Sequence, residues 1–180
     1  MIGRLWTLLM ERKRRRYLAL LQARGMRIGA GVTIEDGFFF DPSHCYLIEI
    51  GARCTLAPNV RLVAHDASTK RLLGATRLGR VVIEEDCFIG DSVLILPGVT
   101  VGKASIVGAG AVVSKSIPAG SLAAGNPARV LGTVEAYRQR QAQRLASGRR
   151  FPADYWVENA TPAQLAELAG AVAIGAVFIE

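Results

Sequence analysis

The side chains best suited to proton transfer in this chain are two histidines, His44 and His65, and each lies where a regular sequence pattern is interrupted. A neutral imidazole accepts a proton near neutral pH and can return it later, which is the chemistry of a general base. The three cysteines show no metal-ligand spacing. Since a zinc centre of three histidines needs one more imidazole than the chain has, we expect no metal.

The regular pattern is a six-residue repeat of large apolar residues, interrupted twice. Its members are Ile28, Ile34, Phe40, Ile50, Leu56, Leu62, Ile83, Ile89, Ile95, Val101, Val107 and Val113. The residue two places earlier is usually small or β-branched, and two of the cysteines, Cys54 and Cys87, stand there, which predicts buried reduced thiols and a cytosolic location. A period of six fits neither a helix nor an alternating strand. It is typical of a parallel β-solenoid.

The two interruptions of the repeat are the places where we expect function. Phe40 and Ile50 are ten residues apart rather than six, so four extra residues bulge out between Pro42 and Cys45, and His44 is one of them. The larger interruption begins beside His65 and forms a predicted loop over residues 64–81. This loop carries four basic residues, Lys70, Arg71, Arg77 and Arg80, and one acid at its start.

The sequence divides into three predicted parts. Residues 1–25 contain a basic helix over 4–24 that Gly25 ends, residues 26–132 are the all-β solenoid, and residues 133–180 are a helical appendage. Within the appendage we expect a helix over 133–146 and a second that starts at Thr161-Pro162 and ends near Gly170. Because a solenoid exposes apolar core and unpaired strand edges at both ends, the helical parts are candidate caps.

The net charge of +7 is concentrated at the N-terminus. Residues 1–27 hold eight Lys and Arg and one acid, while the rest of the chain is balanced, which argues against a nucleic-acid partner. The order of apolar and basic residues is not that of a signal peptide, and no run is long enough to cross a membrane. We therefore expect a cytoplasmic protein. Leu5, Trp6, Leu8 and Leu9 beside the basic residues of 4–27 predict either a solenoid cap or a weak contact with the anionic inner membrane surface.

Several longer motifs lead into and out of the 64–81 loop, and they share order and spacing with one family. They are Ala57-Pro58-Asn59-Val60-Arg61-Leu62-Val63-Ala64-His65-Asp66, Ile83-Glu84-Glu85-Asp86-Cys87-Phe88-Ile89-Gly90-Asp91, Leu96-Pro97-Gly98-Val99-Thr100-Val101-Gly102, Val107-Gly108-Ala109-Gly110-Ala111-Val112-Val113-Ser114-Lys115, and Ala123-Ala124-Gly125-Asn126-Pro127-Ala128-Arg129. Residues 26–132 thereby resemble the hexapeptide-repeat acyltransferases, most closely the maltose, galactoside and nodulation-factor O-acetyltransferase branch and its surface-polysaccharide cousins. The resemblance implies a left-handed parallel β-helix, a homotrimer with active sites between subunits, and acetyl-CoA as co-substrate.

The resemblance also implies catalytic and acceptor residues. His65 matches the family's general base, which takes the proton of an acceptor hydroxyl during direct transfer, without an acyl-enzyme. The backbone N–H of Asp91 matches the donor to the developing oxyanion. Relatives that bind sugars place Asn where this chain has Phe38-Phe39-Phe40, so we expect Asp41 and His44 to supply the missing acceptor contacts.

For the cofactor the resemblance implies a groove of small residues and a cationic end. The small residues are Gly108, Ala109, Ala123 and Gly125, which would admit the slender pantetheine chain. Lys115, next to Ser114, and Arg129 match positions near the nucleotide, where cations suit phosphate oxygens.

The leading interpretation is an acetyl-CoA-dependent O-acetyltransferase acting on a saccharide or glycan precursor. Two alternatives stay open at this stage. One is an N-acetyltransferase of an amino sugar or small antibiotic, because the same base serves both reactions. The other is a non-catalytic structural solenoid, which would not need His65, a loop and a CoA-like segment together.

Overall fold

The computed structural model describes residues 2–180, with side chains described from residue 11 onward. The chain forms two compact units, Met1–Val134 and Glu135–Glu180, and each is described by itself. In the part of the chain that is described, no helix is both long and apolar enough to cross a membrane.

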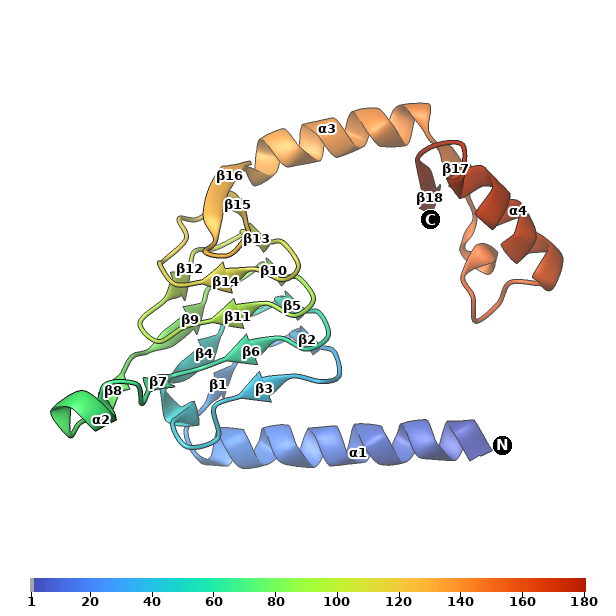
Figure 1. Cartoon of the computed structure of the whole chain (residues 1–180). Coiled ribbons are helices and arrows are strands. Elements are labelled where there is room, and N and C mark those ends of the chain that lie inside the picture. Colours follow the sequence, from blue (N-terminus) through green and yellow to red (C-terminus); the bar gives the residue numbers. More distant parts are fainter. Residues whose placement is uncertain (1) are drawn as a thin grey trace. The chain divides into compact units, whose positions relative to one another are not determined.

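The first unit is built from three sheets of mostly parallel strands, stacked coil upon coil (Figure 1). The first sheet contains β1 (Arg27–Ile28), β4 (Ile48–Ile50), β9 (Val81–Ile83) and β12 (Thr100–Val101). The second contains β2 (Thr33–Ile34), β5 (Thr55–Leu56), β10 (Phe88–Ile89), β13 (Ile106–Val107), β15 (Ser121–Ala124) and β16 (Arg129–Thr133). The third contains β3 (Phe39–Phe40), β6 (Arg61–Leu62), β11 (Leu94–Ile95) and β14 (Val112–Val113). Each of these coils gives one strand to each sheet in turn, as the six-residue repeat predicts for a parallel solenoid.

The hexapeptide repeat forms these strands because its apolar residues stack in register. Ile50 pairs with Ile83 in the first sheet, and both are buried. Leu56 pairs with Ile89 in the second sheet and Leu62 with Ile95 in the third, again fully buried. Burying such a side chain stabilises a fold by about 1.5–3 kcal/mol, so a ladder of them forms a continuous core.

Close stacking of the coils explains the glycines that follow many of the repeat residues. A Cβ placed on Gly51 would lie 2.5 Å from the backbone nitrogen of Glu85 in the next coil. No real side chain fits there, so the glycine is a requirement of coil spacing.

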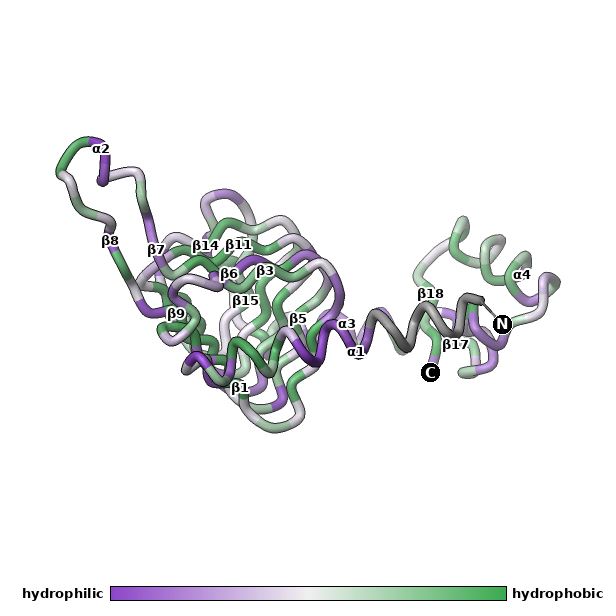
Figure 2. The backbone as a smooth tube through the Cα atoms, turned by 90° about the horizontal axis from the view of Figure 1, so that it is seen from below, coloured by the Kyte–Doolittle hydropathy of each residue, from purple (hydrophilic) through white to green (hydrophobic). Residues whose placement is uncertain are grey.

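The first coil is covered by α1 (Ile2–Ala23), close to the predicted helix over 4–24. Leu21 is fully buried, and Tyr17 and Leu18 pack against the solenoid core. Arg14 donates to the carbonyl of Ile34 at 3.1 Å. The predicted role of Leu5, Trp6, Leu8 and Leu9 lies outside the described side chains. Along the tube of Figure 2, hydrophobic and hydrophilic stretches alternate through the coils and in the coloured part of α1.

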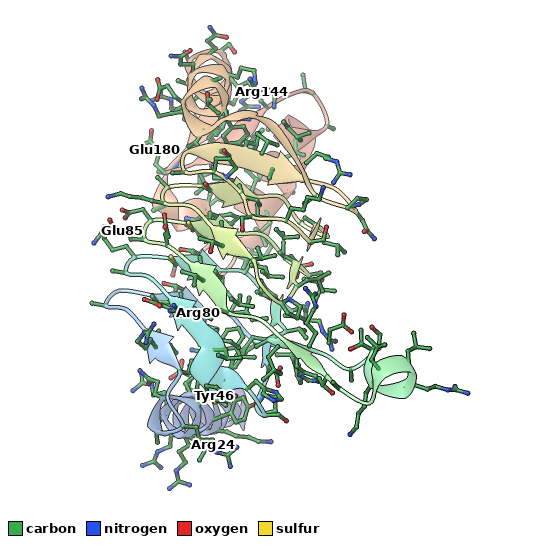
Figure 3. The ribbon with its side chains drawn as sticks, turned by 90° about the vertical axis from the view of Figure 1, so that its left-hand side faces the viewer. Arg24, Tyr46, Arg80, Glu85, Arg144 and Glu180 are labelled. Carbon is green, nitrogen blue, oxygen red and sulfur yellow. The ribbon has the colours of Figure 1, made fainter. Side chains whose placement is uncertain are left out.

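At the other end of the second sheet lies a strand that the repeat did not predict. β16 runs antiparallel to β15 and pairs with it along its length, with an irregularity between Leu122 and Ala123. The loop predicted over 64–81 is also more regular than expected. It is an arm in which β7 (His65–Asp66) pairs antiparallel with β8 (Arg77–Leu78), and α2 (Lys70–Leu73) forms its tip (Figures 1 and 3).

The second unit contains α3, which begins at the unit boundary, and a small helix-and-strand module. Its elements are α3 (Val134–Ser147), β17 (Arg149–Phe151), the 3-10 turn η2 (Ala153–Tyr155), α4 (Pro162–Val172) and β18 (Val177–Ile179). Thr161 caps α4 as predicted, in a reciprocal pair with Gln164. The helix continues past Gly170 to Val172, and the parallel pair β17–β18 was not predicted.

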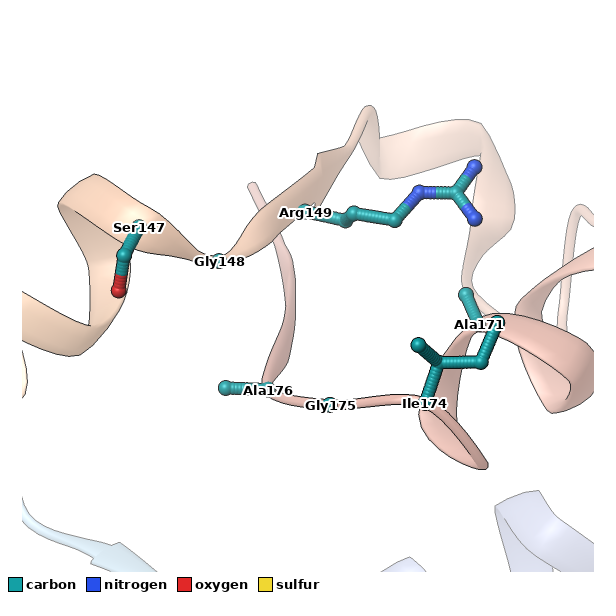
Figure 4. A pocket seen from close by; sticks show the side chains of 7 residues that line it. All are labelled: Ser147, Gly148, Arg149, Ala171, Ile174, Gly175 and Ala176. Atoms are coloured by element: carbon teal, nitrogen blue, oxygen red, sulfur yellow. The ribbon is translucent and has the colours of Figure 1, made fainter.

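A hollow of about 260 Å³ lies in this unit between the end of α3 and the end of α4 (Figure 4). Its lining is mostly small or apolar, with Arg149 as the one charged side chain among the lining residues. It contains none of the predicted site residues.

Candidate active site

The two interruptions of the repeat lie on the same corner of the solenoid, between the third sheet and the first. The bulge follows β3 and the arm follows β6, one coil later. Asp41, which directly precedes the bulge, donates its backbone N–H to the carbonyl of Leu62 at 2.9 Å. Because neighbouring coils stack in register, the bulge and the base of the arm lie side by side.

At this corner a buried carboxylate holds a histidine. The side chain of Asp41 is fully buried, and its Oδ2 accepts from His65 Nδ1 at 2.5 Å and from the Ala64 N–H at 3.2 Å. Its Oδ1 accepts from the backbone N–H groups of Ser43 and His44 at 3.1 and 3.3 Å. Burial acts to raise the pKa of Asp41, but these hydrogen bonds, led by the one from His65, outweigh burial and hold the pKa below its usual value.

The hydrogen bond from His65 to Asp41 fixes which nitrogen of the imidazole ring carries the proton. An ionised carboxylate can only accept, so Nδ1 of His65 carries the proton and Nε2 of the neutral ring keeps its lone pair. About a third of the side chain, 34%, is exposed, which leaves the ring open to a reactant. A ring held in one tautomer with a free Nε2 is the arrangement that a general base requires.

His44 lies beside this pair. Its ring centroid is 5.0 Å from that of His65, and its Nδ1 is 3.8 Å from Asp41 Oδ2, beyond hydrogen-bond range. This Nδ1 is buried and has no hydrogen-bond partner among the described residues. The side chain as a whole is 26% exposed, so the predicted contact of His44 with an acceptor stays open.

Asp41 occupies a different position from the one that an acceptor contact requires. It was predicted together with His44 to bind the acceptor, yet it is fully buried and both its oxygens already accept hydrogen bonds. Its buried, hydrogen-bonded position instead suits a residue that orients the imidazole of His65. The signal in the sequence was an aspartate directly after a repeat residue, where the other repeats carry Gly, Glu, Ala, Val, Leu or Ser, at the start of an Asp-Pro-Ser-His turn.

The predicted oxyanion donor lies on another corner of the same chain. Asp91 follows β10, between the second and third sheets, and its side chain accepts from Asn59 Nδ2 at 3.2 Å and from the Ser92 hydroxyl at 2.9 Å. Among the described residues, its backbone N–H makes no hydrogen bond to the main chain. The N–H is therefore free to bind a ligand, but one chain does not bring it to His65.

The predicted cofactor residues are spread over both corners. Gly108 and Ala109 follow β13 on the Asp91 corner, whereas Ser114 and Lys115 follow β14 on the His65 corner and are exposed. The turn between Gly125 and Ala128 is bonded to Val112 of β14 through the Val112 N–H at 3.0 Å and the Val112 carbonyl at 2.9 Å. Arg129 follows this turn, so it lies near one end of β14 and Lys115 follows the other end.

Ala123 does not line a surface groove. Its side chain is fully buried in β15, and its carbonyl accepts the Gly108 N–H at 2.8 Å. The next residue, Ala124, is the one beside Gly108 on the outside, since a Cβ on Gly108 would lie 2.9 Å from that of Ala124. Any groove of small residues here is therefore formed by Gly108 and Ala124, with Ala123 supporting it from the core.

Comparisons with known proteins agree with this architecture. Residues 80–115 match a family described as bacterial transferase hexapeptide (six repeats). A protein of Schizosaccharomyces pombe named as an acetyltransferase is 40% identical over 92 residues, which cover 49% of this chain and 44% of that protein. A 2,3,4,5-tetrahydropyridine-2,6-dicarboxylate N-acetyltransferase of Staphylococcus aureus is 41% identical over 71 residues, covering 39% and 30%.

A solved structure shows the same fold. The hexapeptide-repeat containing acetyltransferase of Vibrio cholerae superposes with a TM-score of 0.50 at 26% sequence identity, over 67% of this chain and 80% of that one. These similarities support the hexapeptide-repeat acetyltransferase family, and similarity to it implies a left-handed β-helix. The chain spans about half the length of the first curated relatives that it matches.

Proposed function

We propose that this chain is an acetyl-CoA-dependent O-acetyltransferase that modifies a saccharide or glycan precursor, with His65 as general base. The observation that carries the proposal is the hydrogen bond from His65 Nδ1 to the buried Asp41, which leaves Nε2 free at the base of an exposed arm. The similar proteins are named acetyltransferases, which supports an acetyl group as the group transferred. The resemblance of the motifs around Lys115 and Arg129 to those of the family supports acetyl-CoA as the donor of the acetyl group.

In this reaction His65 Nε2 takes the proton of the acceptor hydroxyl while the oxygen attacks the thioester carbonyl. The imidazolium so formed is stabilised by the ionised Asp41 and later protonates the departing thiolate. Asp41 thus acts as a positioning residue. The free N–H of Asp91 is the proposed donor to the developing oxyanion.

Because His65 and Asp91 lie on different corners of one chain, this mechanism needs a second copy. We propose a homotrimer in which the Asp91 corner of one chain meets the His65 corner of its neighbour. Light scattering at micromolar concentration is then expected to give three times the chain mass of 19.3 kDa. A stable, fully active monomer would contradict the shared site.

The test of the function is the release of CoA thiol from acetyl-CoA when candidate saccharides are added. The His65→Ala variant is expected to keep its assembly and its binding of CoA but to lose turnover by about 10²–10⁴-fold. Near-normal turnover in a well-folded variant would refute the assignment of the base. No thiol release with any glycan in the wild-type protein would point to another acceptor or to a scaffold.

An N-acetyltransferase is the second candidate, because a similar protein of 41% identity over 71 residues carries that activity in its name. The base serves an amine as well as a hydroxyl. A panel that pairs each sugar with its amino-sugar analogue separates the two functions, since the preferred member of a pair identifies the reacting atom.

We also propose that the basic N-terminal helix brings the protein weakly to the anionic cytoplasmic membrane surface, as the sequence predicts for residues 4–27. Arg12, Lys13, Arg15 and Arg16 are exposed, while Leu21 faces the core, so the charged side of α1 is free when the helix caps the solenoid. Salt-sensitive sedimentation with anionic vesicles, and none with neutral vesicles, is the expected result. Equal sedimentation with both at low salt would leave α1 as a cap alone.

A further inference from the structure

We propose that Asp41, His44 and His65 form a binding site for a divalent transition-metal ion such as Zn²⁺, and that occupation of this site disables His65 as a base. Each of the three residues offers one ligand atom that lies within 4.8 Å of one from each of the other two. Two imidazoles and one carboxylate are a donor set that Zn²⁺ takes in proteins, with a further position left for water.

The spacing of the donors requires only a small rearrangement. Zinc bonds of about 2.0–2.2 Å place neighbouring ligand atoms about 3.3–3.5 Å apart. Asp41 Oδ2 is 2.5 Å from His65 Nδ1 and 3.8 Å from His44 Nδ1. Changes of about 1 Å or less bring both of these distances to that value, the two imidazoles lie within 4.8 Å of each other, and both partly exposed rings have room to turn.

A second observation points to a ligand at this place. His44 Nδ1 is a buried polar atom without a hydrogen-bond partner among the described residues. Leaving such an atom unsatisfied is costly, so native proteins rarely keep one without a partner in some state. A metal ion bound between His44 and Asp41 provides that partner.

The loss of the base on metal binding, which we call the switch, follows from the tautomer of His65. This half of the inference rests on the proposed function. In the hydrogen bond between His65 and Asp41, Nδ1 carries the proton and donates it to the carboxylate. A metal ion binds only an unprotonated nitrogen, so on binding the neutral ring moves this proton, through solvent, from Nδ1 to Nε2. Nε2 then has no lone pair with which to accept the proton of the acceptor.

The test titrates the full chain with Co²⁺, which reports its ligands through visible absorption, and then displaces Co²⁺ with Zn²⁺. We expect one equivalent of Co²⁺ per chain and a spectrum of nitrogen and oxygen ligands. His44→Ala is expected to weaken binding by about 100-fold or more, beyond the 10–100-fold typical of residues that merely support a metal ligand. Asp66→Asn is the matched control, because this neighbouring acid bonds to Ser68 and Arg77 and lies outside the cluster.

The outcomes separate the metal site from the transferase. No saturable Co²⁺ spectrum, or equal binding by the wild type and His44→Ala, would overturn the site whatever the catalytic activity. A site that binds Co²⁺ while Zn²⁺ leaves acetyl transfer unchanged would overturn the switch alone. If no acetyl transfer is found with any acceptor, the proposed function fails, and the Co²⁺ titration still decides whether the site exists.

Discussion

Asp41 and His65 are 24 residues apart in sequence, yet Asp41 Oδ2 accepts a hydrogen bond from His65 Nδ1 at 2.5 Å. The pair forms because both interruptions of the repeat fall on one corner of the solenoid in successive coils. Asp41 is buried beneath the partly exposed imidazole, so the carboxylate belongs to the core while the histidine reaches the surface.

The first prediction concerns positioning of the base. Asp41→Asn keeps the volume of the side chain but removes the charge that fixes the tautomer of His65 and stabilises its imidazolium. We expect kcat to fall by about 10²–10⁴-fold with little change in the KM for acetyl-CoA. Asp66→Asn should leave kcat near the wild-type value. An unchanged kcat and pH–rate profile in folded Asp41→Asn would show that Asp41 serves stability only.

The second prediction concerns acid stability. The pKa of Asp41 is lowered in the folded chain, so the folded state binds this proton less readily than the unfolded chain does. The carboxylate therefore adds stability above its unfolded pKa of about 3.9, and this contribution is lost as pH falls toward and through the lower folded pKa. Urea unfolding between pH 7 and pH 3 should show a smaller loss in Asp41→Asn than in wild type. Parallel curves for the two proteins would contradict the shift.

The third prediction concerns the cofactor. Lys115 and Arg129 are exposed at opposite ends of β14, and Lys115 makes no ion pair within the described part of the chain. Replacing either with Ala should raise the KM for acetyl-CoA more than that for the acceptor. Arg138→Ala removes an exposed charge of α3 that pairs with Glu135, and it serves as the control. If neither Lys115→Ala nor Arg129→Ala changes the affinity for CoA, the nucleotide binds elsewhere.

The fourth prediction concerns the spacing of the coils. Gly51→Ala places a Cβ 2.5 Å from the backbone of Glu85, so the two coils must separate. We expect the free energy of unfolding to fall by about 1–3 kcal/mol, as is usual for overpacking. Gly110→Asn is the matched change, since Gly110 has a φ of +69° and no heavy atom within 4 Å of an added Cβ, and Asn tolerates that backbone region. Equal losses for the two variants would mean that coil contact does not explain the requirement for glycine.

Much of the architecture could be predicted from the sequence because it depends on local periodicity. The six-residue spacing of Ile83, Ile89 and Ile95 predicted a parallel solenoid, and the structure places these residues in three short strands, one in each of three sheets. The two interruptions and the capping of α4 by Thr161 were also visible, because a missed repeat and a capping pair need only neighbouring residues. β16 was not, since nothing in its five residues fixes the direction in which it pairs.

The site depended on the tertiary structure, because contacts between coils join residues that the chain keeps far apart. The sequence by itself determined that His65 stands at the edge of a break in a solenoid and that His44 stands at another. Only the stacked coils place Asp41 in the core with its carboxylate bonded to His65, and leave Nδ1 of His44 buried beside them. The physical reason is that a residue's position along the repeat sets its corner, whereas register between coils and burial decide which groups on that corner meet and which become charged.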